Sequence, residues 1–447
     1  MDKAQSALAV AIAGQSALAS GANDSALMQD FHGLCALGGR LAGTASEERA
    51  QEWLLQRVRS ISSDVKRHPM PYDGWRCKTH SLQLFDAGAK GPRELHCHPL
   101  LRSANTPAAG LDGEIVDVGD GHPEDFARAG RRLRGRMALV RHEYPFLPRH
   151  VHRRRKYNMA LEAGAIGFLI ANPLPGGGVL SGSSGRPAGG FGIPAAYIGD
   201  ADCTAIVQAG QHGLARVRLH IDGEDLPDAR AGVTVLDLPG ATENRIVISA
   251  HLDGHDLGQS ALDNASGVCV VLAAARALAP RMASATHGLR VCIFSAEEWA
   301  LAGSARYVGD MDAVERASLA LNINLDTVAG DDHFTALISD FPQLAEFTAQ
   351  AGRDAGAPLA CHLPLMPNSD HASFAAHGIP ALRLLAGFDR ADSRVRHILS
   401  ADDQAGVVLE HELRQALRLT VAMAWRGLTM PAAELAALRR RTDDKTV

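Results

Sequence analysis

The sequence predicts an α/β fold, in which a mixed, mostly parallel sheet is flanked by helices and a smaller α+β or mainly β domain is inserted. The chain has 447 residues, which is too long for one ordinary domain and suits two. Strand-like and helix-like segments alternate along residues 233–428, as in proteins built on parallel sheets. Short strands between glycines occupy 93–230 instead. We therefore expect a domain formed by 1–92 and 231–447, with 93–230 as the insert.

The elements expected in the larger domain follow from periodicity. Residues 47–58 carry apolar side chains at helical spacing, and 79–86 alternate like a strand. Further strands are expected at 234–238, 246–250, 289–295, 319–325 and 380–385. Helices are expected at 267–279, from 302 and at 404–428. The alternation places several strand ends at one edge of the sheet, where ligands of such folds gather.

The insert is expected to contain shorter elements than the larger domain. Strands are expected at 113–119, 136–141, 165–171 and 193–198, with a helix at 157–164 that glycine ends. Residues 173–192 are so rich in Gly, Ser and Pro that they predict an irregular loop. These short elements predict a compact domain.

Composition narrows the class of protein. A hydrophobic fraction of 46% and a charged fraction of 21% are typical of a soluble globular protein, and a formal charge of −5 argues against nucleic acid as a partner. No uncharged apolar run reaches the roughly 18–20 residues that span a membrane, so no membrane partner is expected. A homo-oligomer is compatible with the sequence.

The N-terminus and the cysteines bear on localisation. Residues 7–19 are alanine-rich, but Asp2 replaces the positive charge of a signal peptide and Gln15 interrupts the apolar stretch. We expect a helical arm; the alternative is an atypical signal and an exported protein. The seven cysteines are scattered, odd in number and without CxxC spacing, which favours reduced thiols in the cytoplasm.

Imidazoles and carboxylates follow successive predicted strands. His251 and Asp253 come after the strand at 246–250, and Glu297 and Glu298 come after 289–295. Three more candidates are Asp326, which follows 319–325, Asp263, which precedes the next helix, and His397, in the loop before the last helix. Nitrogen and oxygen ligands of this kind suit zinc, and one bridging carboxylate holds a metal pair well. The sequence therefore predicts two Zn²⁺ ions.

Chemistry suggests a role for each side chain. Asp263 could bridge the ions, with His251 and Asp326 completing one site and Glu298 with His397 the other. Asp253 is a candidate to accept the second N–H of the His251 imidazole. Glu297 is the natural general base, which takes a proton from water and passes it to the leaving amine. Taken singly, an HxD after a strand or a Glu-Glu pair is usually a solvated turn or helix start; their ordered recurrence at strand ends favours a site.

The same residues resemble the M28 family of metallopeptidases, the di-zinc aminopeptidases and glutamate-carboxypeptidase relatives. The similarity covers roughly 233–428 together with 39–58, and it includes several motifs. They are Ser249-Ala250-His251-Leu252-Asp253, Ala261 to Gly267, Phe294 to Ser304, Asn324-Leu325-Asp326, Ser369-Asp370-His371 and His397 with Asp402. The insert resembles the protease-associated (PA) domain of many members.

This resemblance implies a zinc-exopeptidase-like fold and a set of site residues. The implied ligands are His251, Asp263, Glu298, Asp326 and His397. It also implies that Asp263 bridges, that Glu297 is the base and that a cis peptide follows Asp263. One position departs from the pattern, since some members place a Tyr before the last His, where this chain has Arg396. The oxyanion contact of that Tyr is therefore open here.

The function expected from this resemblance is a zinc-dependent exopeptidase that hydrolyses peptides, most simply an aminopeptidase. A carboxypeptidase of the glutamate-carboxypeptidase type is the nearest alternative, and an amidase-like relative is a further one. A non-catalytic binding protein of the same fold would be signalled by lost ligands, and the pattern retains them all.

Overall fold

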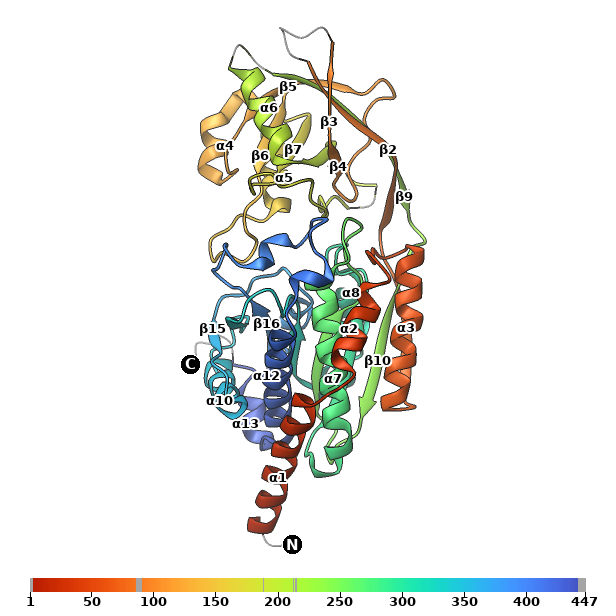
Figure 1. Cartoon of the computed structure of the whole chain (residues 1–447), viewed down its shortest axis with the longest axis vertical. Helices are drawn as coiled ribbons and strands as arrows, with labels where there is room; N and C mark the ends of the chain where they lie inside the picture. Colours follow the sequence, from red (N-terminus) through yellow and green to blue (C-terminus); the bar gives the residue numbers. More distant parts are fainter. Residues whose placement is uncertain (1–2, 86–90, 188, 212, 214, 441–447) are drawn as a thin grey trace. The chain divides into compact units, whose positions relative to one another are not determined.

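The computed structural model describes residues 3–85, 91–187, 189–211, 213 and 215–440 (Figure 1). Its contacts divide the chain into two compact units. The first unit combines Met1–Pro71, Arg230–Ile398 and Asp402–Val447. The second combines Tyr72–Ala229 with Leu399–Ala401.

The first unit is built on an eight-stranded mixed sheet with the order β1-β10-β12-β11-β13-β16-β14-β15. Its strands are β1 (Val65–Pro71), β10 (Arg230–Leu238), β11 (Arg245–His251), β12 (Gly288–Phe294), β13 (Leu319–Leu325), β14 (Phe334–Leu337), β15 (Ala360–His362) and β16 (Ala381–Ala386). The central strands β12, β11, β13 and β16 run parallel. β12, β13 and β16 are buried along their whole length, as expected of strands covered on both faces. The expected mixed, mostly parallel sheet is confirmed.

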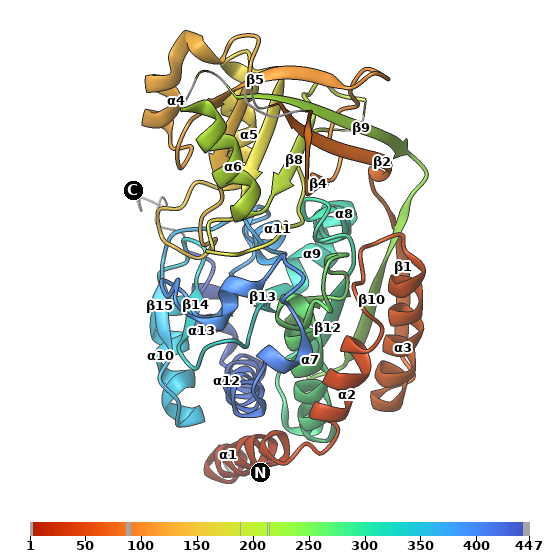
Figure 2. The same cartoon turned by 45° about the horizontal axis from the view of Figure 1, so that its top comes forward.

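Helices flank this sheet. They are α1 (Lys3–Ala22), α2 (Leu27–Cys35), α3 (Ala45–Ile61), α7 (Ser266–Leu278), α8 (Ala302–Asp310), α9 (Ala313–Ser318), α10 (Leu344–Ala355), α11 (His371–Ala375), α12 (Glu410–Thr429) and α13 (Ala432–Ala437). The green α7 and blue α12 pack against each other and against β11, and α1 crosses both (Figure 2). All of α7 except Arg276 is buried, so this helix is the centre of the core.

The last long helix begins later than the sequence predicts. Its first residue is Glu410 rather than Gln404. The Glu412 carboxylate accepts hydrogen bonds from the N–H groups of Leu409 and Gly330, which fixes the helix start at this point. Ala405–Val407 form a separate short 3₁₀ turn.

One helical stretch of the described chain, Ala261–Ser284, is long and apolar enough to cross a membrane by length and composition alone. Within the fold, 89% of its apolar window is buried, which is the situation of a core helix in a globular domain.

The second unit holds another eight-stranded sheet, with the order β3-β2-β9-β5-β6-β7-β8-β4. Its strands are β2 (Gly74–Phe85), β3 (Arg93–Leu95), β4 (Cys97–Pro99), β5 (Leu111–Asp117), β6 (Met137–Arg141), β7 (Gly167–Ala171), β8 (Ala195–Ile198) and β9 (Arg216–Leu226). Its helices are α4 (Pro123–Ala129), α5 (Arg153–Glu162) and α6 (Asp200–Gly210). β5 to β8 are parallel neighbours, and the four strands expected in the insert correspond to them.

The unit starts at Tyr72, earlier than the expected boundary at residue 93. The reason is a long antiparallel pairing, in which β2 runs beside β9 from Gly74 opposite Leu226 to Phe85 opposite Arg216. The sequence of β2 alone cannot show this pairing, because the partner strand lies more than a hundred residues away along the chain.

Candidate metal centre

The carboxyl ends of three neighbouring strands deliver most of the candidate residues. His251 is the last residue of β11 and lies opposite Phe294, the last residue of β12. The segment after β12 carries Glu297 and Glu298, and Asp326 directly follows β13, the other neighbour of β11. Parallel strands end at the same edge of a sheet, so these side chains meet there.

Asp263 reaches the same place from the segment Ala261–Ala265, which leads into α7. A cis peptide joins Asp263 to Asn264, as the family resemblance implies. The Asn264 side chain anchors the segment, since its amide donates to the carbonyl of Leu325 at 2.8 Å and its oxygen accepts from Gly267 N at 2.9 Å. Asp263 is thereby tied to the end of β13.

Short distances separate these ligand atoms. His251 Nε2 lies 3.2 Å from Asp263 Oδ1 and 3.6 Å from Asp326 Oδ1. Ligand atoms of His251, Asp263 and Glu298 all lie within 4.8 Å of one another, and the same holds for His251, Glu297 and Asp326. Two ligands at about 2.0–2.1 Å from one zinc ion with tetrahedral angles are roughly 3.3–3.4 Å apart. The distances from His251 Nε2 to Asp263 Oδ1 and Asp326 Oδ1 therefore suit a common ion.

Buried polar atoms at the site also call for a partner. Among the described residues, no hydrogen bond reaches His251 Nε2 or Glu298 Oε1, and both atoms are buried. A buried polar group without a partner costs free energy, and buried charges are normally paired or coordinate metals. The clustered carboxylates and imidazoles, with such atoms among them, are a donor set that fits metal ions.

Opposite charges dominate the electrostatics of this cluster. Burial raises the pKa of Asp263, but the nearby His251 and His255 imidazoles outweigh this effect and lower that pKa overall. For His251 the balance is the reverse: burial lowers its pKa, the carboxylates of Glu297 and Asp326 raise it, and the net shift is upward. Each carboxylate–imidazole pair thus favours the charged forms of both groups.

Glu297 stands beside the ligands in a different environment. Burial raises its pKa well above the usual range; the His251 imidazole opposes this shift, and the Glu298 carboxylate adds to it. The preceding Ala296 has φ 58°, a left-handed conformation that is uncommon for a residue with a side chain. A carboxylate with a raised pKa next to the ligands suits a general base.

Asp253 holds the segment that carries the two glutamates. Its carboxylate accepts the backbone N–H of Glu297 at 3.1 Å and that of Glu298 at 3.3 Å. The Nδ1–H of His251 donates instead to the backbone carbonyl of Asp253 at 3.0 Å, while the carboxylate is 3.7 Å from Nδ1. The imidazole therefore donates to the main-chain carbonyl of Asp253 and not, as the sequence predicts, to its carboxylate. The carboxylate is engaged with the backbone of Glu297 and Glu298.

His397 lies outside both groups of closely spaced ligand atoms. It ends the 3₁₀ turn Arg394–His397, its side chain is 24% exposed, and its Nδ1 is 3.8 Å from Asp402 Oδ2. The structure therefore brings together four of the five ligands that the sequence predicts, namely His251, Asp263, Glu298 and Asp326. The fifth stays a prediction.

Three further charged residues support the site, and sequence patterns did not single them out. Arg383 Nη2 lies 3.0 Å from Asp326 Oδ1, and the guanidinium lowers the pKa of that carboxyl against the effect of burial. Asp403 accepts the N–H groups of Leu262 at 2.7 Å and Asp263 at 3.3 Å. Arg40 lies more than two hundred residues before the loop that it contacts, and Asp403 contacts main-chain groups about 140 residues away, so no spacing rule could find these contacts.

His255 is the fourth residue that the sequence prediction missed. It lies 2.7 Å from Glu298 Oε1 and 3.6 Å from Asp263 Oδ2, through its Nε2 atom. A signal did exist in the sequence, since His251, Asp253 and His255 stand at alternate positions in one short segment.

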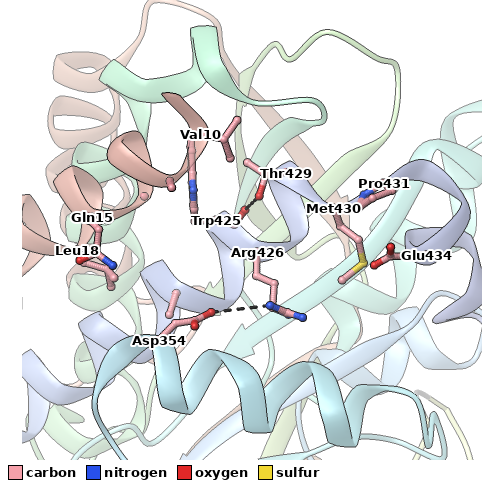
Figure 3. A pocket seen from close by; sticks show the side chains of 13 residues that line it. Val10, Gln15, Leu18, Asp354, Trp425, Arg426, Thr429, Met430, Pro431 and Glu434 are labelled. Carbon is pink, nitrogen blue, oxygen red and sulfur yellow. Dashed lines mark hydrogen bonds and ion pairs between the residues drawn. The ribbon is translucent and has the colours of Figure 1, made fainter. Parts of the chain in front are cut away.

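A separate pocket lies between α1 and α12 (Figure 3). Gly14, Leu18 and Trp425 are among its lining residues, and Arg426 pairs with Asp354 at 3.8 Å beside it. None of the predicted site residues lines this pocket, so it is not a rival for the same chemistry.

Comparisons with known proteins match two family models to separate parts of the chain. The model of peptidase family M28 matches residues 234–412, and the model of the PA domain matches residues 101–206. The M28 match contains every predicted site residue, and the PA match lies within the second unit.

Three curated relatives are identical to this chain at about a quarter of the aligned positions. Probable leucine aminopeptidase 2 of Aspergillus fumigatus is 28% identical over 62% of this chain and 56% of its own length. Aminopeptidase YwaD of Bacillus subtilis is 24% identical over 88% of this chain and 82% of its own. Carboxypeptidase Q of Homo sapiens is 25% identical over 61% and 58%. The chain thus spans little more than half of two of these three relatives.

Solved structures agree on the fold. BSAP, a zinc aminopeptidase from Bacillus subtilis, matches with a TM-score of 0.69 and 21% identity, covering 95% of this chain and 97% of that one. Both units find their counterparts within a match of this extent. The chain thus contains a peptidase domain of the M28 kind, matched over residues 234–412, and a PA domain, matched over residues 101–206.

Proposed function

We propose that the protein is a metal-dependent exopeptidase that removes residues from the amino terminus of peptides. The observation that carries the proposal is the cluster of His251, Asp263, Glu298 and Asp326 at the strand ends, with Glu297 beside it. Relatives named as aminopeptidases, and a similar structure named as a zinc aminopeptidase, support this function and zinc as the metal.

The clustered residues have distinct roles in holding the metal ions and in positioning the base. His251 and Asp326 would hold one ion, Glu298 and the predicted ligand His397 would hold the second, and Asp263 would bridge the two. Two zinc ions in this position supply Lewis-acid polarisation of the scissile carbonyl and activation of a water molecule. Asp253 keeps Glu298 and the base in place through their backbone N–H groups.

Glu297 performs the proton transfers. Its carboxylate takes a proton from the attacking water and delivers it to the amine that leaves. The buried surroundings that raise its pKa favour the protonated form that must follow the first transfer. The same group can then act as the acid in the second half of the reaction.

A Glu297→Gln variant tests the proposed mechanism. We expect bound metal to stay and kcat to fall by about 10²–10⁴-fold, because the amide cannot accept the proton. Steady-state kinetics with metal analysis measures both quantities, and Glu243→Gln, an exposed glutamate, is the control. Full activity of the Glu297→Gln protein would show that another group is the base.

A set of blocked peptides tests the direction of cleavage. An aminopeptidase cleaves a free tripeptide and its C-terminal amide but not the N-acetylated form. A carboxypeptidase, which the match to carboxypeptidase Q keeps as the second candidate, cleaves the free and N-acetylated forms but not the amide. Chromatography of the products distinguishes them directly.

We further propose that the protein works in the cytoplasm. All seven cysteines are free in the structure, which suits a reducing compartment. Fractionation of the producing cells tests this proposal, and recovery of the native protein outside the cytoplasm would overturn it.

A further inference from the structure

The pocket between α1 and α12 is separate from the metal centre and has a volume of about 440 Å³. Pockets that hold small ligands measure roughly 300–1,000 Å³, so this one is large enough to be a binding site. Its residues come from α1, α10, α12 and α13 and the short link between the last two, all within the first unit. None of them takes part in the proposed chemistry, which therefore does not use this pocket.

The α1 helix forms one wall of the pocket, and specific contacts fix it in place. Gly14 faces Trp425, and a Cβ atom on this glycine would lie 2.6 Å from the indole Nε1. The alanine-rich helix thus carries its glycine where it comes close to α12. Arg281 donates to the carbonyl of Ser16 at 3.2 Å, to its hydroxyl at 2.9 Å and to Ser20 Oγ at 3.0 Å. This wall is therefore held as part of the folded domain.

Apolar side chains line much of the pocket. Val10 and Leu18 contribute from α1. On the opposite side, Ala422 and Trp425 contribute from α12, and Met430 directly follows that helix. Covering the surface that they leave open to water is favourable for an apolar group. The pocket therefore favours a ligand with an apolar part.

Both signs of charge are present beside this apolar surface. The Arg426 guanidinium is paired with Asp354 at 3.8 Å, and Figure 3 shows it between Asp354 and Glu434. Arg426 Nε has no hydrogen-bond partner among the described residues, and the side chains of Arg426 and Asp354 are 34% and 42% exposed. A long, partly exposed ion pair of this kind holds its members weakly. The guanidinium thus keeps donors for a carboxylate, which Arg commonly binds through two N–H groups.

We propose that this pocket binds a free α-amino acid with an apolar side chain. The carboxylate of the ligand pairs with Arg426, and its ammonium group pairs with Asp354. Its side chain covers Trp425 and Met430. The 3.8 Å between Arg426 and Asp354 suits a ligand that carries opposite charges on one carbon atom, whereas a peptide holds its terminal charges farther apart. The assignment concerns a second site and does not rest on the proposed peptidase function.

A tryptophan fluorescence titration with L-leucine tests the proposal, because Trp425 lines the pocket. We expect a saturable change with L-leucine. Leucinamide lacks the carboxylate, N-acetyl-leucine lacks the ammonium group and glycine lacks the apolar side chain, so each should bind at least about 10-fold more weakly. Equal binding of leucine and leucinamide would overturn the proposal.

Two arginine variants connect the binding to Arg426. Arg426→Gln removes the cation and should weaken L-leucine binding by about 10–100-fold, with the binding of leucinamide unchanged. Arg418→Gln is the matched control. Arg418 lies in the same helix and its Nε also lacks a hydrogen-bond partner among the described residues, but it does not line the pocket. Equal leucine affinity in the two variants would contradict the assignment.

The metal centre is another place where an amino acid can bind, and Asp263→Ala separates the two sites. This change disrupts the metal centre and leaves the pocket untouched, so leucine should still alter the fluorescence. Loss of the signal in Asp263→Ala, or its persistence in Trp425→Phe, would place the binding outside the pocket and overturn the proposal.

A crystal structure of the unaltered protein grown with L-leucine gives an independent answer, and it applies even if a variant fails to fold. The proposal expects the leucine carboxylate within hydrogen-bond distance of the Arg426 guanidinium, at about 2.7–2.9 Å. Leucine bound at the metal centre alone, or an empty pocket at a saturating concentration, would refute it and leave the proposed function intact.

Discussion

Arg40 lies in the turn between α2 and α3, and its guanidinium is completely buried. It donates to the carbonyl groups of Leu252 at 2.9 Å, Gln259 at 2.7 Å and Ser260 at 2.9 Å. These three residues belong to the loop that runs from His251 to Asp263. One side chain thus holds together the loop that carries two ligands. Burial lowers the pKa of Arg40, and nearby acidic groups oppose this shift.

Replacing Arg40 by Met should loosen this loop. The variant leaves the carbonyls of Leu252 and Gln259 without these donors, while that of Ser260 keeps the N–H of Ala265. We expect the free energy of unfolding to fall by about 2–5 kcal/mol, with weaker metal binding. Urea denaturation and zinc titration measure the two effects. Arg59→Met, an exposed position in α3, serves as the control. Unchanged stability and metal affinity in Arg40→Met would contradict the role of the guanidinium.

Sequence patterns identified the residues at strand ends and missed those that support them. His251, Glu298 and Asp326 could be predicted because each follows a recognisable apolar strand, and parallel strands end together. Arg40 comes from a turn more than two hundred residues before Leu252. Asp403 follows the 3₁₀ turn that His397 ends, and it contacts Leu262, 141 residues earlier in the chain. Their roles depend on how loops fold back, which periodicity does not encode.

At the scale of elements, α7 begins in very close contact with the end of β13. A Cβ atom on Gly267 would lie 2.3 Å from Asn264 Oδ1 and 2.4 Å from the carbonyl oxygen of Leu325. Only glycine allows this approach, because real Cβ atoms do not come so near. The contact places the first turn of α7, and with it Asp263, beside Asp326.

A Gly267→Ala variant should disturb the centre through this contact. The added methyl must push the helix start or Asn264 away, and we expect a loss of stability of about 1–3 kcal/mol together with weaker zinc binding. Thermal unfolding and zinc titration test it. The control is Gly309→Ala in α8, where no atom lies within 4 Å and the change should be neutral or slightly stabilising. Equal behaviour of the two variants would refute the packing argument.

Elements of the core were easier to predict than those at the edges. β11, β12, β13 and β16 are apolar runs bounded by turns, and the sequence placed each within a few residues. β14 and β15 were missed, because they are four and three residues long and lack a period of their own. Short edge strands depend on the neighbour that pairs with them, here β16 for β14.

At the scale of the whole molecule, buried histidines link the stability of the second unit, here called the PA unit, to pH. Three partly buried histidines of the PA unit, His142, His150 and His152, have lowered pKa values. Burial is the main cause, and the cations Arg153 and Lys156 add to the shift of His142. Protonation of these rings is therefore harder in the folded unit than in the unfolded chain.

Acidification should destabilise the PA unit for this reason. A histidine with a depressed pKa contributes stability above the unfolded value of about 6.5, and that contribution is lost as pH falls below it, by up to about 1.4 kcal/mol per pH unit for each ring. We expect thermal unfolding at pH 5.5 and 7.5 to differ less in a His142→Gln/His152→Gln protein than in the wild type. The same pH dependence in both proteins would rule these histidines out as its source.

The central claim is a pair of metal ions bridged by Asp263, and metal content measures it most directly. Mass spectrometry of the purified chain should find two zinc ions in the wild type and in the exposed-site control Asp64→Ala. Asp263→Ala removes an oxygen from both positions and should hold one ion at most. Wild-type protein without tightly bound metal, or an Asp263→Ala protein that keeps two ions, would contradict the account.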